Sequence, residues 1–342
     1  MANVNRSRQI GTRPTLRDIA QEVGVTVTTA SFVLNGSKSG TRVSDETRRA
    51  LEEAAKRIGY RPNNLARSLV RQKCGVIAMY SSYDEINARN YFFAEIMGGL
   101  QVGCGKAGVD LLIHTSSPGS DNEAIAASLL DGRADGVIVH AAANHQLPHI
   151  IAKSGVPAVA IADRVDFIPS VVVDDEEGGA LQARHLFERG HRRVLYRPAF
   201  GDFLSAVERE GAFFREAERL GVEVILGDVA PSRHRAEFSE RECDLLLSEE
   251  RPSAIVCWED ATADRTISVL EGMGLKTPRD LAVMGFNGIS VEFAHRRWLT
   301  TIDAHWANVA EAAIGVLIHQ IEGKDVPPVT TLPVHFVQGA TT

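Results

Sequence analysis

The feature that most limits the fold of this chain is an alternation of short β-rich runs with stretches of helix length, which continues from Cys74 onward. Such alternation predicts βαβ units and therefore parallel sheets. The β-rich runs form two series, which predict two open sheets and therefore two lobes. Ligands of such sheets bind beyond the carboxyl ends of the strands, so a ligand site is expected in the cleft between the lobes. The first series is residues 76–79, 109–113, 137–139 and 156–161, and the second is a run near Val171 and residues 193–196, 222–226, 254–258 and 281–286.

The first 73 residues differ from the rest of the chain in charge. They carry 14 Lys and Arg against 6 Asp and Glu, a net charge of +8, whereas the other residues carry 23 against 38, a net charge of −15. The two parts together give the −7 of the whole chain. A basic head on an acidic body favours contact between the head and a polyanion, because Lys and Arg neutralise phosphate charge.

The 342 residues exceed what one ordinary core organises, so several domains are expected. We predict a flexible N-terminus at 1–13, a helix-turn-helix domain at 14–60, a hinge linker and helix at 61–73, and a two-lobed effector-binding and dimerisation domain at 74–342. No apolar run approaches the roughly 20 residues that span a bilayer, and the basic residues near the start precede no apolar signal core. A cytoplasmic protein is expected.

Residues 15–36 have the pattern of two short helices joined by a tight turn. Thr15 and Asp18 form a capping box at the start of the first helix, and Gly24 ends it. Thr26 caps the second helix, which ends at Asn35. Such a pair of helices crosses steeply in a helix-turn-helix, and the second helix offers its N-terminal side chains to base edges. The outward-facing residues of the second helix are Val27, Thr28, Thr29, Ser31 and Phe32.

A third helix, capped by Ser44 and ended by Gly59, closes a small three-helix core. A generic three-helix docking module is the alternative to a DNA-binding domain. After Pro62, residues 65–70 can form only a helix of less than two turns. An isolated helix this short is marginal in water, so it requires a partner.

Four motifs stand in order in this segment: TLRDIAxxVGVTxxTASxVLNG at 15–36, VSxxTR at 43–48, GYxPN at 59–63 and AxxL at 66–69. Together they resemble the LacI/GalR family of bacterial transcriptional regulators. The resemblance implies base reading by the start of the second helix, phosphate contacts around it, and a leucine wedged into the minor groove. The implied DNA-binding residues are Thr15, Leu16, Thr26, Val27, Thr28, Thr29, Ser31, Phe32, Asn35, Arg42, Ala66, Arg67 and Leu69. Phe32 stands where many members have Arg, so a different operator is expected.

The body resembles the same family through motifs such as DGVI at 135–138 and LTTI at 299–302. The resemblance implies two Rossmann-like lobes, similar to periplasmic sugar-binding proteins, around a small-molecule effector. Glu208 replaces a family Arg, which disfavours an anionic ligand and favours a neutral polyol or a cation. The candidate effector contacts are Phe92, Phe93, Ser116, Asp163, Arg164, Glu208, Trp258, Asp260 and Asn287. For the aromatic rings among them, plain core packing is the alternative.

Catalytic motifs are missing from the sequence: it contains no GxSxG, P-loop or HExxH pattern. His185 and Glu188, three residues apart on a predicted helix, are interpreted as a surface pair rather than as an acid–base dyad. The four cysteines are widely spaced and are expected to be reduced. The sequence therefore predicts neither an enzyme nor a bound cofactor or metal ion.

The predicted function is an effector-controlled repressor that binds duplex operator DNA of near-palindromic sequence as a homodimer. Effector binding is expected to change the angle between the lobes and so the paired linkers. No leucine heptad follows a final strand predicted at Thr331–Val337, which favours a dimer over a tetramer. Two alternatives remain: a regulator of this type controlled by a protein partner, and a solute-binding protein.

Overall fold

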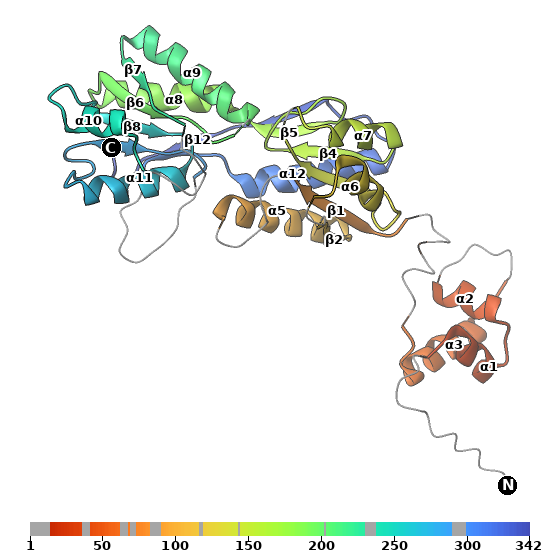
Figure 1. Ribbon diagram of the computed structural model, residues 1–342. Coiled ribbons are helices and arrows are strands. Elements are labelled where there is room, and N and C mark those ends of the chain that lie inside the picture. Colours follow the sequence, from red (N-terminus) through yellow and green to blue (C-terminus); the bar gives the residue numbers. More distant parts are fainter. Residues whose placement is uncertain are drawn as a thin grey trace. The chain divides into compact units, whose positions relative to one another are not determined.

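The computed structural model divides into two compact units, residues 1–75 and 76–342 (Figure 1). The division lies next to the predicted start of the two-lobed domain. The finer boundaries predicted within the first 73 residues remain predictions. The residues that the structure describes are 14–35, 42–61, 68, 73–82, 90–115, 119–142, 144–201, 203–229, 237–288 and 299–342.

The helices that can be described in full in the first unit are α1 (Leu16–Val23), α2 (Val27–Asn35) and α3 (Asp45–Ile58). Their apolar positions recur at helical spacing, which places one face of each helix toward a shared core. Ile19, Ala30 and Leu51, one from each helix, are fully buried there. The predicted three-helix arrangement is thus present in the described part of the head.

The second unit consists of two lobes. The first lobe contains β1 (Val76–Ser81), α5 (Tyr91–Ala107), β2 (Asp110–Ile113), α6 (Asn122–Leu129), β3 (Gly136–His140), α7 (Leu147–Ser154), β4 (Ala158–Ile161), β5 (Ser170–Val173), α12 (Trp306–Ile321) and β11 (Val329–Leu332). The second lobe contains α8 (Asp175–Glu188), β6 (Arg193–Arg197), α9 (Leu204–Leu220), β7 (Glu223–Leu226), α10 (Glu240–Leu247), β8 (Ala254–Cys257), α11 (Asp260–Gly272), β9 (Ala282–Met284), β10 (Thr301–Asp303) and β12 (His335–Val337).

Each lobe is built on a parallel sheet, as predicted. In the first lobe the strand order is β11-β5-β4-β3-β1-β2, and in the second it is β7-β6-β8-β9. All neighbouring strands in these two sheets are parallel, and β10 and β12 form a separate antiparallel pair. The predicted fold class, an α/β body of two Rossmann-like lobes behind a helix-turn-helix head, is confirmed.

In the described part of the body, the chain crosses between the lobes from β5 to α8, from β10 to α12, and from β11 to β12. The third crossing corrects the prediction of one final strand at Thr331–Val337. Leu332 ends a strand that pairs with β5, whereas His335 begins one that pairs with β10. Pro333 lies between them, and a proline cannot donate the hydrogen bond that would continue a strand ladder.

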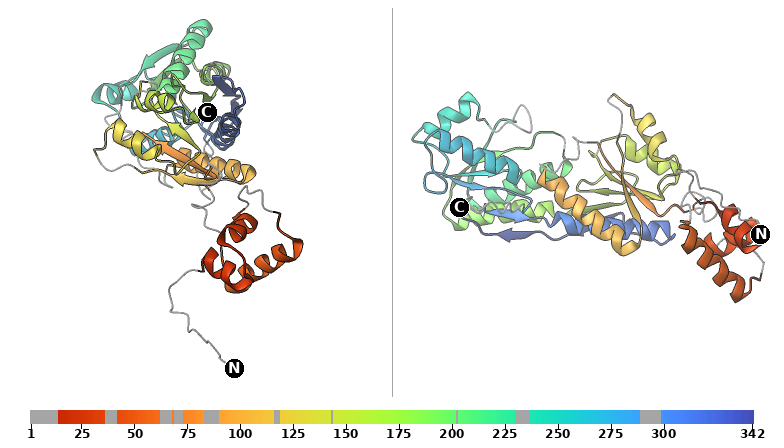
Figure 2. Two further views of the ribbon diagram at one scale, coloured as in Figure 1. Left: turned by 90° about the vertical axis from the view of Figure 1, so that its right-hand side faces the viewer. Right: turned by 90° about the horizontal axis from the view of Figure 1, so that it is seen from below.

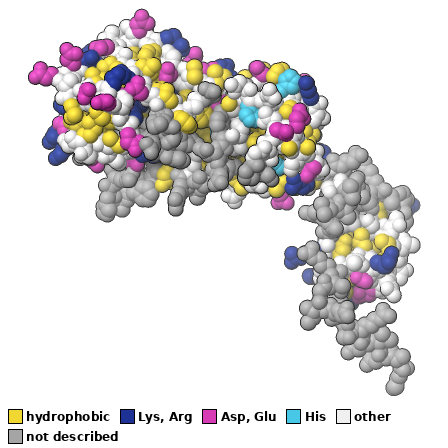
Figure 3. Space-filling view, in the orientation of Figure 1, with side chains coloured by type: hydrophobic (Ala, Val, Ile, Leu, Met, Phe, Trp, Pro, Cys, Tyr) yellow, Lys and Arg dark blue, Asp and Glu magenta, His cyan; other side chains and the backbone are white. Residues whose placement is uncertain are grey.

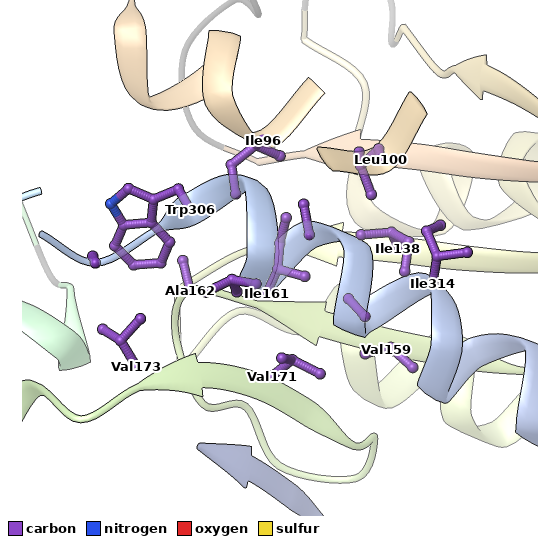
Figure 4. Close-up of a cluster of buried hydrophobic side chains, with 14 of the residues drawn as sticks. Ile96, Leu100, Ile138, Val159, Ile161, Ala162, Val171, Val173, Trp306 and Ile314 are labelled. Atoms are coloured by element: carbon purple, nitrogen blue, oxygen red, sulfur yellow. The ribbon is translucent and has the colours of Figure 1, made fainter. Parts of the chain in front are cut away.

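Helices α5 and α12 lie side by side on one face of the first sheet (Figure 2). Their apolar side chains meet those of the strands in the largest core of the body (Figure 4). In that close-up, Ile96 of α5 and Ile314 of α12 lie above Val159 of β4. The two helices approach closely at Gly99, where an added Cβ atom would lie 2.0 Å from the carbonyl oxygen of Ala307.

Two predictions about single side chains have different outcomes. All four cysteines are free thiols, as predicted. The interpretation of His185 as half of a surface pair is wrong, because His185 is 8% exposed: its ring packs on Phe336, and Nε2 lies 2.8 Å from Thr342 Oγ1. Among the described residues, no helix is both long and apolar enough to cross a membrane.

Candidate nucleic-acid interface and effector site

Local hydrogen bonds cap the starts of α1 and α2. Thr15 N–H donates to Asp18 Oδ2 at 2.8 Å, and Asp18 N–H donates to Thr15 Oγ1 at 3.3 Å, which completes the predicted capping box. Gly24 ends α1 with φ of 76°, in the left-handed region that favours glycine. Thr29 N–H then donates to Thr26 Oγ1 at 3.1 Å, which caps the start of α2. These bonds hold the start of α2 in a defined position in the head.

The most exposed part of α2 is its first turn. Val27 is 43% exposed although it is apolar, and Thr28 is also exposed. Further along α2, the half-buried residues are Thr29, Ser31 and Phe32. Of the other predicted contacts that the structure describes, Leu16 is half-buried, and the exposed ones are Thr15, Thr26 and Arg42. Asn35 is buried, and its Nδ2 donates to Ser31 Oγ at 3.2 Å. The helix therefore offers its N-terminal residues, rather than its last turn, to a partner.

The positive charge of the head lies partly outside the described residues. Within the first 73 residues, the described positions include 8 Lys and Arg and all 6 Asp and Glu, whereas the other 6 basic residues lie outside them. Ala66, Arg67 and Leu69 of the predicted hinge also lie outside. On the face of the body shown in Figure 3, acidic and basic side chains are intermingled over both lobes. The acidic excess of the body is therefore not one continuous patch in that view.

Three predicted effector residues meet at the boundary between the lobes. Asp163 and Arg164 follow β4 of the first lobe and contact the first turns of α9 in the second. Asp163 is 1% exposed, and its Oδ1 accepts a hydrogen bond from the backbone N–H of Ser205 at 2.8 Å. Arg164 forms an ion pair with Glu208. The Glu208 carboxylate thus has a cationic partner from the other lobe.

An aromatic group links the end of the first sheet to the second lobe. Phe93 is 1% exposed and belongs to the hydrophobic core, so for this ring the alternative of plain core packing holds. Phe92 is half-buried, with its ring centroid 4.9 Å from that of Trp306 and 5.3 Å from that of His140. Trp306 Nε1–H donates to Asn287 Oδ1, across the lobe boundary, at 3.0 Å.

Two further candidates, Trp258 and Asp260, follow β8 of the second lobe. Trp258 follows β8, and its ring stacks on Phe203 with centroids 5.5 Å apart and planes 20° apart. Asp260 is buried at the start of α11 and accepts a hydrogen bond from Thr301 Oγ1 at 2.6 Å. Ser116 lies outside the described residues. Trp258 and Asp260 thus lie at the end of a strand, and their contact with an effector remains a prediction.

Arg209, adjacent to Glu208, has a different environment that the sequence did not reveal. It is 4% exposed, and its Nη2 donates to Asp175 Oδ1 at 2.7 Å while Nη1 donates to the carbonyl oxygen of Trp258 at 2.5 Å. Its guanidinium carbon lies 3.3 Å from the centroid of the Phe286 ring. Burial raises the pKa of Asp175 to about 6, and the Arg209 charge opposes that rise. The pair joins α8 to α9 inside the second lobe.

The site residues absent from the sequence prediction are Phe203, Ser205 and Trp306. Ser205 acts through its backbone N–H, which no side-chain pattern reveals, and Trp306 stands nineteen positions after its partner Asn287. Within the described ranges, no group of three His, Cys, Asp or Glu side chains could hold a metal ion.

Two parts of the chain match known protein families. The description of bacterial regulatory proteins of the lacI family matches residues 15–63, and that of the periplasmic binding protein-like domain matches residues 183–342. A helix-turn-helix module followed by such a body defines a regulatory protein of two parts. The head is thus similar to the lacI family of bacterial regulatory proteins. The curated relatives that match the chain are named transcriptional repressors, in line with the predicted regulatory function.

Curated relatives cover nearly the whole chain. The HTH-type transcriptional repressor PurR of Aliivibrio fischeri (strain MJ11) is 28% identical over 319 residues, which covers 91% of this chain and 93% of the relative. PurR of Yersinia enterocolitica is 28% identical over 337 residues, 94% of each chain.

Solved structures of the same fold include the Lac repressor dimer bound to operator and the anti-inducer ONPF. The TM-score is 0.80 at 23% identity, over 96% of this chain and 99% of that one. A complex of the transcriptional regulator CelR with cellobiose has a TM-score of 0.67 at 25% identity, over 96% of this chain and all of the other. The likeness extends over both the head and the body.

Proposed function

We propose that this protein is a transcriptional repressor that binds operator DNA as a homodimer through its helix-turn-helix head and is controlled by a small molecule bound between the lobes of its body. The observation that carries the proposal is the exposed first turn of α2, held by the Thr26 cap in a head that matches the lacI family. Short side chains at the start of a recognition helix reach base edges in the major groove. The PurR relatives are themselves repressors.

Two copies are part of the proposal because one small head buries too little surface for specific binding. Specific protein–DNA interfaces bury about 1,000–2,500 Å² of protein surface, and dimers reach this by reading two half-sites one helical turn apart. The Lac repressor of similar fold was solved as a dimer on its operator. The minor-groove role of Leu69 rests on the family resemblance alone.

The pairing of the arginines near the lobe boundary favours a neutral or cationic effector. Three arginines lie near the carboxyl ends of the strands, and each already contacts acceptors of the protein: Arg164 pairs with Glu208, and Arg209 pairs with Asp175. Arg197 is 2% exposed and donates to Thr266 Oγ1 at 2.9 Å. An anionic ligand would have to take a guanidinium from such a partner and leave the partner unpaired, which is costly in a buried site.

The DNA-binding proposal is tested by selecting chromosomal fragments with the purified chain and measuring affinity by fluorescence anisotropy. Thr28→Ala should weaken binding to the selected duplex by about 5- to 100-fold, the range of one lost base contact, and leave binding to a shuffled duplex unchanged. Gln21→Ala is the matched control, because Gln21 is exposed on α1 but lies outside the predicted DNA-binding residues. Equal binding to all fragments, or equal loss in both variants, would contradict the proposal.

The effector proposal is tested on the same complex with a panel of sugars, polyols, amines and sugar phosphates. Release or tightening by a neutral or cationic compound supports it, and a response confined to the phosphates contradicts the charge argument. A complex that no compound changes would favour control by a protein partner instead.

A further inference from the structure

The first turn of α9 is not capped by its own residues. Its N-cap, Phe203, makes no side-chain capping bond, and the first turn carries no acidic residue. Helices α6, α8 and α10 are all capped by a side chain of their own N-cap residue. In α9 an N–H of the first turn, that of Ser205, instead donates to the buried carboxylate of Asp163 in the other lobe. A carboxylate at this end is also favoured by the helix dipole.

A second contact between the same segments lies one turn further along α9. Arg164, the neighbour of Asp163, pairs with Glu208, and the two side chains are 47% and 24% exposed. Other ion pairs of α9 stay within the second lobe, for example Arg215 with Glu176 at 3.0 Å. Two consecutive residues of the first lobe therefore hold two positions of one helix of the second lobe.

We propose that Asp163 and Arg164 form a latch on α9 that favours the present arrangement of the lobes and opens when the angle between them changes. The latch consists of Asp163, Arg164, Ser205 and Glu208. A capping bond shifts an equilibrium by about fivefold and a partly exposed ion pair by about twofold, so the latch biases the lobes by about one order of magnitude. A ligand with a modest preference for the open or closed arrangement can overcome a bias of this size. Only the consequence for DNA binding rests on the proposed function.

Hydrogen exchange of the full-length chain, followed by mass spectrometry, tests the latch without DNA. In Arg164→Glu, exchange in peptides containing residues 204–208 should rise by about three- to tenfold, because the Ser205 amide loses its acceptor when the lobes separate. Peptides across the crossing at 303–306, which the altered side chain does not touch, should also exchange faster. The double variant Arg164→Glu/Glu208→Arg should restore both to the original rates.

Arg215→Glu is the matched control, because it disturbs an ion pair of α9 that does not cross the lobe boundary. It should leave exchange at 204–208 and 303–306 unchanged. The latch is rejected if Arg164→Glu changes neither segment, if only the peptide at 204–208 responds, or if the double variant fails to restore protection. None of these readouts depends on operator binding, so the repressor proposal can fail separately, in the anisotropy measurement.

Discussion

Substituting Gly99 in α5 tests how closely that helix must approach α12. A Cβ atom there would lie 2.0 Å from the carbonyl oxygen of Ala307, whereas ordinary contact begins at 3.4 Å, so the helices must separate by about 1.4 Å. The obstacle is backbone and not a flexible side chain. Because Ala307 follows Trp306, this displacement also moves the indole that donates to Asn287.

The expected magnitude combines two opposing terms. Because the obstacle is backbone, the overpacking cost should lie at the upper end of its usual range, about 3 kcal/mol. Alanine regains about 1 kcal/mol of helix propensity relative to glycine, so Gly99→Ala should lose about 2 kcal/mol of stability. Gly105→Ala provides a matched control in the same helix, since no other atom lies within 4 Å of a Cβ at Gly105. It should gain about 0.5–1 kcal/mol from propensity alone.

Thermal unfolding of the two variants, followed by calorimetry, separates these outcomes. A loss of 2 kcal/mol lowers the melting temperature of a domain of this size by about 4–8 °C, and the control variant should melt about 1–3 °C above the original chain. Equal shifts in the two variants would show that α5 and α12 do not approach at Gly99 as described, and the argument from the glycine contact would then be refuted.

Two further predictions concern buried ionisable side chains of the second lobe. Asp175→Ala should cost about 3–5 kcal/mol of unfolding free energy, because Arg209 keeps its buried charge without its partner; the double variant Asp175→Leu/Arg209→Met should regain most of this in urea titrations, and no regain would contradict the pairing. Burial lowers the pKa of His185 to about 4 from 6.5, so the folded chain binds fewer protons than the unfolded chain between these values. The contribution of His185 to the free energy of unfolding is therefore fully present above pH 6.5 and is lost as the pH falls toward 4. At pH 4.5 the loss amounts to about 2 kcal/mol. In His185→Gln the loss between pH 7 and pH 4.5 should be smaller by that amount; an identical loss would exclude His185 as its source.

The parts of the fold that the sequence predicts are those with local causes. The limits of α1 follow from the capping pair Thr15 and Asp18 and from Gly24, all within ten residues. The strands follow from the spacing of apolar residues against turn signals, which is also local. The positions of Asp163 and Trp258 after strands are then consequences of parallel-sheet topology, in which strand ends collect at one edge.

Features that depend on distant partners were beyond prediction. The split at Pro333 follows from pairing with strands in two different lobes, and nothing local distinguishes it from one long strand. His185 is buried because Phe336 and Thr342, more than 150 positions away, cover it. The DNA-binding roles of α2 and the effector roles at the lobe boundary remain predictions, since contact with a ligand depends on groups outside the chain.

Glu208 and Arg209 show how one helix serves two mechanical purposes. Neighbouring residues of a helix point about 100° apart, so on α9 one faces the first lobe and the other faces the interior of its own lobe. The Arg209 pair is almost fully buried, and breaking it leaves an uncompensated charge, so it fixes α9 to α8. The Glu208 pair is partly exposed, and water can replace either partner at little cost. Helix α9 is therefore fixed within the second lobe but only reversibly bound to the first lobe. A lobe that rotates as a rigid body requires this combination.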